Sequence, residues 1–195
     1  MTGLAPVLDW EARYREGTTG WQREDVNPAF LAWRADGTLR PGRILVPGAG
    51  RSVEPKLMAE AGFAVTVIDV APSAVAFQQE RLAPFGGRAV EANLFEWKPD
   101  AAFDSIYEQT CLCALPPALW EAYALSLAEW LRRGGVLAAL FMQTGREGGP
   151  PFHCDMDRMR ALFAPPAWRW PAALPAAIDR PPIGMSEQPA ALVRT

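Results

Sequence analysis

Two glycines stand directly after an apolar stretch of the chain, where they could leave the backbone open to a ligand. The segment 43–46, apolar except for Arg43, is followed by Gly48 and Gly50. Glycine permits a sharp turn and lets a ligand approach the bare main chain. A second apolar stretch, 63–68, ends at Asp69, whose carboxylate can accept hydrogen bonds from the two hydroxyls of a ribose. The pattern is that of a strand, turn, helix and strand that bind a nucleotide.

The third glycine position of the usual dinucleotide-binding pattern narrows the choice of ligand. It is occupied by Val53 rather than glycine. A dinucleotide needs that glycine for close helix packing beside its pyrophosphate, whereas an adenosine without phosphates does not. The pattern therefore favours S-adenosylmethionine over NAD. The alternative is that the glycines only connect a strand to a helix and that Asp69 is a turn residue.

Strands and helices are predicted to alternate along most of the chain. Their spacing predicts an α/β fold with a doubly wound, mostly parallel, seven-stranded sheet of the Rossmann-like kind. From residue 164 onward prolines are frequent, and this segment is expected to wrap the domain. Ser52 is the expected cap of a helix that ends near Gly62. The other expected helices are 8–16, 30–33, 72–82, 117–132 and 155–163, and the expected strands are 43–46, 63–68, 89–92, 103–110, 136–142 and the edge strands 168–171 and 190–194.

Length, charge and the lengths of the apolar stretches argue against several other classes of protein. The 195 residues suit one domain, which we divide into an N-terminal cover (1–40), a cofactor-binding core (41–142) and an acceptor-side segment (143–195). The net charge of -3 and the lack of a Lys/Arg run argue against a nucleic-acid partner. No apolar stretch reaches the roughly 18 residues that span a bilayer. The N-terminus lacks the features of a signal peptide, so a cytoplasmic protein is expected.

Residues at the carboxyl ends of the expected strands form the candidate site, because open α/β sheets bind ligands at that edge. Asn93 could offer its amide to an adenine, and Leu94 could pack on the face of the ring. Gln109 lies at the end of the fourth strand. Trp10 and Tyr14 lie four residues apart on one helix face, where an aromatic ring could stabilise a sulfonium cation by about 0.5–2 kcal/mol. The alternative is that this face packs into the core.

Other residues with possible chemistry are few. His153 is the only histidine and the candidate general base, with packing in a loop as its alternative. Cys111, Cys113 and Cys154 do not match a zinc-binding spacing, so no metal site is predicted.

The chain resembles the thiopurine S-methyltransferase family, in the branch that includes thiol, thiocyanate and halide methyltransferases. No single motif is decisive, but their order and spacing together are specific. The matching segments are 10–14, 17–21, 27–28, 44–52, 67–69, 103–110, 114–117 and 148–152.

The resemblance implies a class I methyltransferase that depends on S-adenosylmethionine, releases S-adenosylhomocysteine and acts as a monomer. The methyl group would go to sulfur, or a comparable soft nucleophile, of a small molecule. The residues implied at the cofactor are Trp10, Tyr14, Trp21, Gly48, Gly50, Asp69, Asn93, Leu94 and Gln109. Three apolar residues near the family motifs, Phe30, Trp33 and Phe152, are expected to shape the acceptor pocket.

Some positions depart from the family pattern. Tyr14 stands where tryptophan is common, and Glu108 stands where relatives carry aspartate. Gln109 replaces the arginine of the thiopurine enzymes, which argues against a thiopurine acceptor. Two other functions stay open. One is methyl transfer to oxygen or nitrogen, which more often needs a base; the other is binding of S-adenosylmethionine or S-adenosylhomocysteine without transfer.

Overall fold

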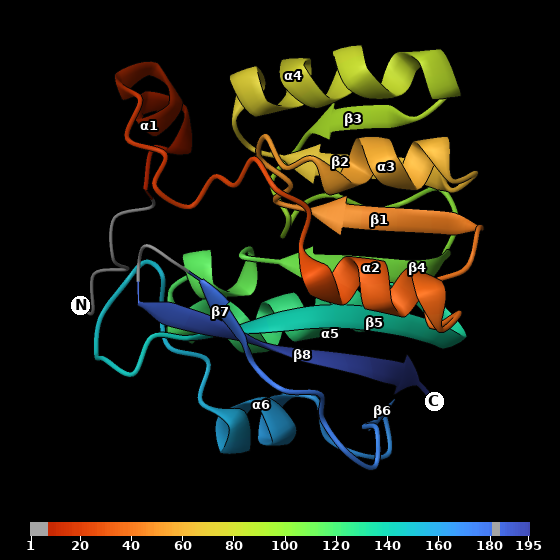
Figure 1. Ribbon diagram of the computed structural model, residues 1–195, viewed down its shortest axis with the longest axis vertical. Helices are drawn as coiled ribbons and strands as arrows, with labels where there is room; N and C mark the ends of the chain where they lie inside the picture. Colours follow the sequence, from red (N-terminus) through yellow and green to blue (C-terminus); the bar gives the residue numbers. More distant parts are fainter. Residues whose placement is uncertain (1–7, 181–183) are drawn as a thin grey trace.

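Eight strands form one sheet in the computed structural model, which describes residues 8–180 and 184–195 (Figure 1). Along the sheet the order is β3-β2-β1-β4-β5-β8-β6, and β7 also pairs with β8. β1 to β5 are parallel, whereas β8 runs antiparallel to β5, β6 and β7. The strands are β1 (Arg43–Pro47), β2 (Ala64–Asp69), β3 (Arg88–Glu91), β4 (Phe103–Gln109), β5 (Leu131–Gln143), β6 (Trp168–Arg169), β7 (Ile178–Arg180) and β8 (Met185–Arg194).

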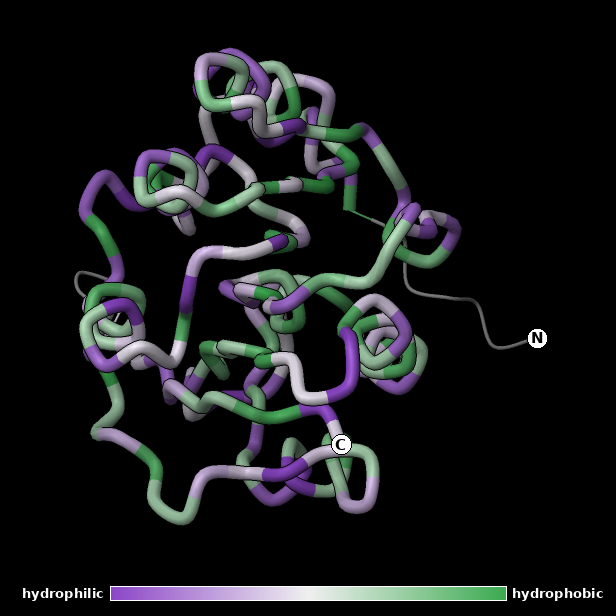
Figure 2. The backbone as a smooth tube through the Cα atoms, turned by 90° about the vertical axis from the view of Figure 1, so that its right-hand side faces the viewer, coloured by the Kyte–Doolittle hydropathy of each residue, from purple (hydrophilic) through white to green (hydrophobic). Residues whose placement is uncertain are grey.

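Helices cover both faces of the sheet, as a doubly wound fold requires (Figures 1 and 2). The core forms two clusters because successive strand residues point to opposite faces. Ile44 and Val46 pack with α2, α3 and α4, whereas Leu45 packs with α5 and α6. The helices are α1 (Trp10–Glu16), α2 (Pro28–Ala35), α3 (Glu54–Glu60), α4 (Pro72–Leu82), α5 (Trp120–Trp130) and α6 (Met156–Leu162). The predicted fold class is confirmed, with eight strands instead of seven.

The C-terminal strand corrects one expectation. The sequence predicts an edge strand over 190–194, but β8 begins at Met185 and lies between β5 and β6. Proline cannot donate to a strand ladder and usually marks an edge. Pro189 is accommodated because β7 pairs with β8 only up to Glu187 and β6 pairs only from Val193 onward. The C-terminal part of the proline-rich segment therefore lies inside the sheet.

Two helix boundaries also differ from the expected ones. Ser52 does not cap α3, because Val53 is the residue before its first turn and makes no side-chain cap. The helix expected over 117–132 is a short 3₁₀ turn, Pro117–Leu119, followed by α5. Asp9, in contrast, caps α1 by accepting a hydrogen bond from Ala12 N at 2.8 Å.

The carboxyl ends of β1, β2 and β3 meet at the edge of the sheet beside α1, on the left of Figure 1. Within 8–180 and 184–195, every helix is too short or too polar to cross a membrane. Residues 1–7, on which the expectation of no signal peptide rests, lie outside the described part of the chain, as do 181–183 of the proline-rich segment.

Candidate cofactor site

The turn after β1 accepts only glycine at two positions. Gly48 and Gly50 have φ values of 55° and 52°, in the left-handed region that other residues rarely adopt. A Cβ on Gly48 would lie 2.7 Å from Cys111 Sγ, and a Cβ on Gly50 would lie 2.5 Å from the Tyr14 hydroxyl oxygen. Two bonds from Gln78 Nε2, to Gly50 O and Ser52 O at 2.9 Å each, tie the turn to α4. The turn is therefore rigid and tightly surrounded.

Asp69 ends β2 and holds this turn directly. One carboxylate oxygen accepts from Gly50 N at 2.8 Å, and the other accepts from Ala71 N at 2.9 Å. Burial of the side chain raises its pKa, and these main-chain donors oppose the rise. Each oxygen keeps a further lone pair that can accept from a ligand hydroxyl. Asp69 is thus a turn residue, and it also stands where a ribose would need an acceptor.

Three aromatic side chains cover the turn. Trp21 packs edge-on against Trp10 and Tyr14, with ring centroids 5.3 and 5.8 Å apart. The Arg51 guanidinium lies 4.9 Å from the centre of the Tyr14 ring. None of the residues of α1 is buried, and neither core cluster includes Trp10 or Tyr14. The alternative that they form the core face of a packed helix is therefore not supported, and we call Trp10, Tyr14 and Trp21 the aromatic cover.

A hydrogen-bonded contact that the sequence did not reveal holds α1 in place. Glu11 accepts from Ser73 N at 3.0 Å and from Ser73 Oγ at 2.9 Å. Ser73 lies in the first turn of α4, whose own cap position is Ala71 and has no side-chain acceptor. Glu11 therefore supplies the missing cap from another helix, and these bonds lower its pKa.

A small cavity of about 40 Å³ lies between the glycine turn, Trp21 of the aromatic cover and the end of β4. Gln109 lines it and accepts from the Tyr107 hydroxyl at 2.9 Å through its Oε1. Thr110 also lines it with a φ of 61°, a strained value for a β-branched residue. The lining residues include Trp21, Arg23, Gly48, Gly50, Arg51, Glu54, Tyr107, Gln109 and Thr110.

Asn93 and Leu94 follow β3 at the same edge of the sheet but do not line this cavity. Asn93 is exposed, and its side chain is engaged in its own turn: Oδ1 accepts from Phe95 N at 3.0 Å, and Nδ2 donates to Glu96 Oε1 at 3.2 Å. Leu94 is half-buried against the core cluster on the α5 face. The Asn93 amide keeps one N–H and one lone pair on Oδ1, so it could bind an adenine without giving up these partners.

A buried polar network anchors the segment that follows the cover. Asn27 Nδ2 donates to Glu187 Oε2 at 2.7 Å, and Asn27 N donates to Glu54 Oε1 at 2.9 Å. Arg23 NH1 lies 3.8 Å from Glu187 Oε2. Asn27 and Glu187 are 160 positions apart in the sequence, so no local pattern could have indicated this network.

Glu108 is an unusual acid beside the site. Its side chain is buried on the α5 face of β4, which raises its pKa to about 7. Oε1 accepts from Leu112 N at 2.7 Å, whereas Oε2 has no hydrogen-bond partner among the described residues. The nearby thiols of Cys111, Cys113 and Cys154 are buried and form no disulfide bond with any described residue. The described residues contain no group of three or more acids, histidines and cysteines that could hold a metal.

Two of the residues expected at an acceptor pocket belong to the core. Phe30 is 0% exposed and Trp33 is 5% exposed, and both rings pack edge-on against Tyr107. The reason is that α2 is a full helix of eight residues, so these positions share the face that packs on the sheet. In this structure they support Tyr107 from behind and do not line the cavity.

Phe152 and His153 lie in the loop after β5. Phe152 is half-buried and donates its N–H to Cys113 O at 2.7 Å. His153 Nδ1 accepts from Thr144 N at 3.0 Å and from Gly145 N at 3.3 Å. A neutral imidazole with Nδ1 as acceptor carries its proton on Nε2, so its basic lone pair is already in use. This geometry favours the loop-packing role of His153 over the role of a base.

The residues at the glycine turn suit S-adenosylmethionine. The turn brings the main chain of two glycines beside Asp69, Asp69 offers carboxylate lone pairs at the end of β2, and aromatic rings suited to a sulfonium pack on the turn. The fold and site are those of the Rossmann-like methyltransferases that depend on S-adenosylmethionine. The sequence model of the family described as thiopurine S-methyltransferase matches residues 7–173, and the chain belongs to this family.

Individual relatives agree with this membership. The chain is 29% identical to thiocyanate methyltransferase 1 of Arabidopsis thaliana over 164 residues, which cover 80% of this chain and 71% of the relative. It is 31% identical to thiopurine S-methyltransferase of Azotobacter vinelandii over 174 residues, covering 79% and 80%.

Solved structures show the same fold. The 1,6-didemethyltoxoflavin-N1-methyltransferase of Burkholderia thailandensis, with bound S-adenosylhomocysteine, has a TM-score of 0.73 at 21% identity, covering 94% of this chain and 84% of that one. The magnesium protoporphyrin IX methyltransferase of Synechocystis has a TM-score of 0.71 at 14% identity, covering 94% of both chains.

Proposed function

We propose that this enzyme transfers a methyl group to sulfur, or to a comparable soft nucleophile, on a small molecule. The relatives named for thiocyanate, thiol and thiopurine methylation support this class of acceptor. The observation that carries the proposal is the aromatic cover packed over the glycine turn beside Asp69, in a chain of this family. The net charge of -3 on the chain supports a small-molecule acceptor over nucleic acid. We also infer that the enzyme is a cytoplasmic monomer.

When bound, S-adenosylmethionine supplies an electrophilic methyl group on a positively charged sulfur. Asp69 would accept hydrogen bonds from the ribose, and Leu94 and Asn93 would face the adenine. Gly48 and Gly50, with their left-handed φ values, would form the turn beside the methionyl part. Trp10, Tyr14 and Trp21 would exclude water and align the donor with its acceptor.

The acceptor would reach the methyl group from the side of Gln109 and Thr110. Both line the small cavity at the end of β4, opposite the glycine turn. A thiolate or another soft anion is already a strong nucleophile and needs no general base. The occupied Nδ1 of His153 agrees with transfer that uses no histidine base.

A radiolabelled-methyl assay tests the proposal. The purified protein is incubated with labelled S-adenosylmethionine and an alkyl thiol, thiocyanate, iodide or a thiopurine, with a phenol and an amine as oxygen and nitrogen acceptors, at several pH values. We expect label on a sulfur or halide acceptor, and strongly reduced label in Asp69→Asn. Label only on the phenol or amine would favour oxygen or nitrogen transfer. Tight S-adenosylhomocysteine binding without any turnover would favour a protein that only binds the cofactor.

A further inference from the structure

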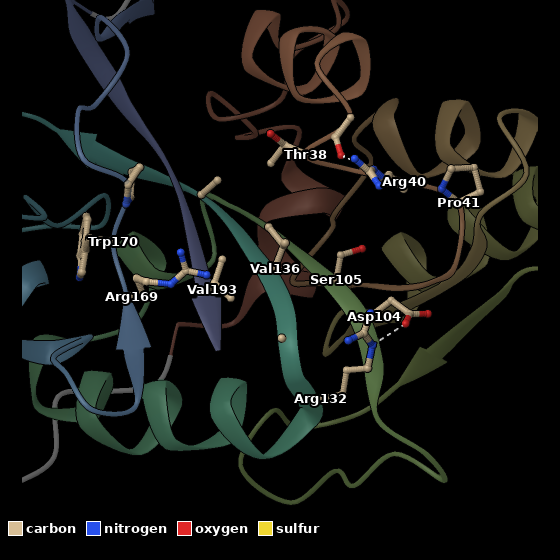
Figure 3. Close-up of a pocket in the computed structure, with 14 residues that line it drawn as sticks. Thr38, Arg40, Pro41, Asp104, Ser105, Arg132, Val136, Arg169, Trp170 and Val193 are labelled. Carbon is tan, nitrogen blue, oxygen red and sulfur yellow. Dashed lines mark hydrogen bonds and ion pairs between the residues drawn. The ribbon is translucent and has the colours of Figure 1, made fainter. Parts of the chain in front are cut away.

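A much larger cavity, of about 700 Å³, lies between the loop 37–41 and residues 169–171 (Figure 3). It is at the amino ends of β4 and β5, whereas the glycine turn follows the carboxyl end of β1. Its floor is made by the first residues of β4 and β5 and the last residues of β8. One wall is the loop 37–41 between α2 and β1, and the other is 169–171. Parallel strands bind their principal ligand at the carboxyl edge, so this cavity is separate from the methyl-transfer site. Nothing in the proposed reaction uses it.

Arginine side chains dominate the charge around this cavity. Arg40 and Arg169 stand on opposite walls, and Arg132 lies at the floor (Figure 3). The single acid, Asp104, is already engaged: Oδ1 accepts from Arg132 Nε at 2.7 Å, and Oδ2 accepts from Arg43 N at 2.8 Å. Within 8–180 and 184–195, no carboxylate forms an ion pair with Arg40 or Arg169. Three guanidinium groups against one carboxylate leave a positive site on a chain whose net charge is negative.

A buried hydroxyl without a partner lies in the floor of the same cavity. Ser105 lines the floor and is 4% exposed, and its Oγ forms no hydrogen bond with any described residue. Buried polar groups are nearly always hydrogen-bonded, so an unpaired one indicates a missing ligand or water. Ser105 supports a ligand at this site independently of the arginines, because it is uncharged and lies in the floor between the two walls.

The rest of the lining is apolar. Val136, Ala191 and Val193 cover the floor, and Trp170 and Pro171 line the wall beside Arg169. A volume of this size is typical of small-molecule sites, which combine an apolar lining with a few polar groups that set the orientation. A polyanion would instead need a broad basic surface, which the composition argues against.

We propose that this cavity binds a small organic anion at a second site. The carboxylate or phosphate of the ligand would lie between Arg40, Arg132 and Arg169, with Ser105 as a further donor. Its apolar body would pack on Val136 and Val193. Guanidinium groups bind both kinds of anion in a bidentate way, so the two head groups share one recognition chemistry.

Isothermal titration of the full chain with benzoate and with phenyl phosphate tests the proposal and separates the two head groups. Benzyl alcohol is the neutral control. All titrations are run with saturating S-adenosylhomocysteine, so that the cofactor site is closed. We expect saturable binding of at least one anion at one site, weaker at high salt, and none of the alcohol.

Single variants identify the site. Arg40→Gln and Arg169→Gln should each weaken binding about tenfold or more, the effect of losing a charged hydrogen bond. Arg133→Gln is the matched control, because Arg133 is exposed, adjacent to Arg132 and outside the lining. Ser105→Ala should weaken binding and leave the unliganded protein at least as stable, since it removes an unpaired hydroxyl. The proposal is overturned by the absence of saturable binding of both anions, or by an equal loss in Arg133→Gln.

Discussion

Gly50→Ala is expected to displace the aromatic cover from the glycine turn. The new Cβ would stand 2.5 Å from the Tyr14 hydroxyl oxygen, with the next atoms, Tyr14 Cζ and Trp21 Nε1, at 3.8 and 3.9 Å. The turn is held by Asp69 and Gln78, whereas α1 contains no buried residue. The cover is therefore expected to move and the turn to stay. Because its aromatic side chains are proposed to contact the cofactor, affinity for S-adenosylhomocysteine should fall.

The cost has two separable parts. The φ of 52° at Gly50 makes an L residue unfavourable by about 1–2 kcal/mol whatever space surrounds it. For a chain of this length, that cost lowers the melting temperature by about 2–8 °C. The contact with Tyr14 is the second part, and it depends on a single oxygen atom. Tyr14→Phe removes that atom and leaves ordinary contacts, so Gly50→Ala/Tyr14→Phe should regain cofactor affinity without regaining the stability lost to the backbone.

The two parts are measured in a double-mutant cycle of wild type, Gly50→Ala, Tyr14→Phe and the double variant. Thermal unfolding measures the backbone cost, and calorimetric titration with S-adenosylhomocysteine measures the effect of the contact with Tyr14. Gly48→Ala is the matched control. It has nearly the same φ, but its Cβ would meet Cys111 Sγ at 2.7 Å in the core instead of the cover. It should destabilise the fold and show no coupling to Tyr14→Phe. Wild-type cofactor affinity in Gly50→Ala, or no recovery in the double variant, would refute the placement of the cover on this turn.

Three further outcomes are expected. Glu11→Gln should weaken the bond to Ser73 and speed tryptic cleavage at Arg13 and Arg15, compared with the exposed control Glu16→Gln. The bonds to Ser73 lower the pKa of Glu11. Their contribution to stability is therefore complete above the ordinary pKa of glutamate and is lost as the pH falls through the lowered pKa of the folded protein. Equal cleavage rates would contradict this role. Glu108 has a folded pKa of about 7 against an ordinary 4.5, so wild-type stability should fall by about 3 kcal/mol as pH rises between these values, and Glu108→Gln should abolish that slope in denaturant titrations. Asp69→Asn should weaken S-adenosylhomocysteine binding by about 1.5–3 kcal/mol in calorimetry, and unchanged affinity would remove Asp69 from the cofactor site.

The sequence predicted the features that depend on neighbours along the chain. The glycine turn, Asp69 at the end of β2 and the pair Trp10 and Tyr14 all follow from strand and helix periodicity and from glycine's access to left-handed φ. A local backbone preference acts through nearby residues, and it needs no knowledge of the rest of the fold.

Tertiary structure alone decided which surfaces meet. Phe30 and Trp33 are as apolar as the aromatic cover, yet α2 buries them on the sheet while α1 leaves its rings over the turn. The Glu11 cap on Ser73 joins residues 62 positions apart, and the bond from Asn27 to Glu187 joins residues 160 apart. Burial and hydrogen-bond partners of this kind arise only when distant elements dock, because packing, and not local propensity, selects the face that leaves water.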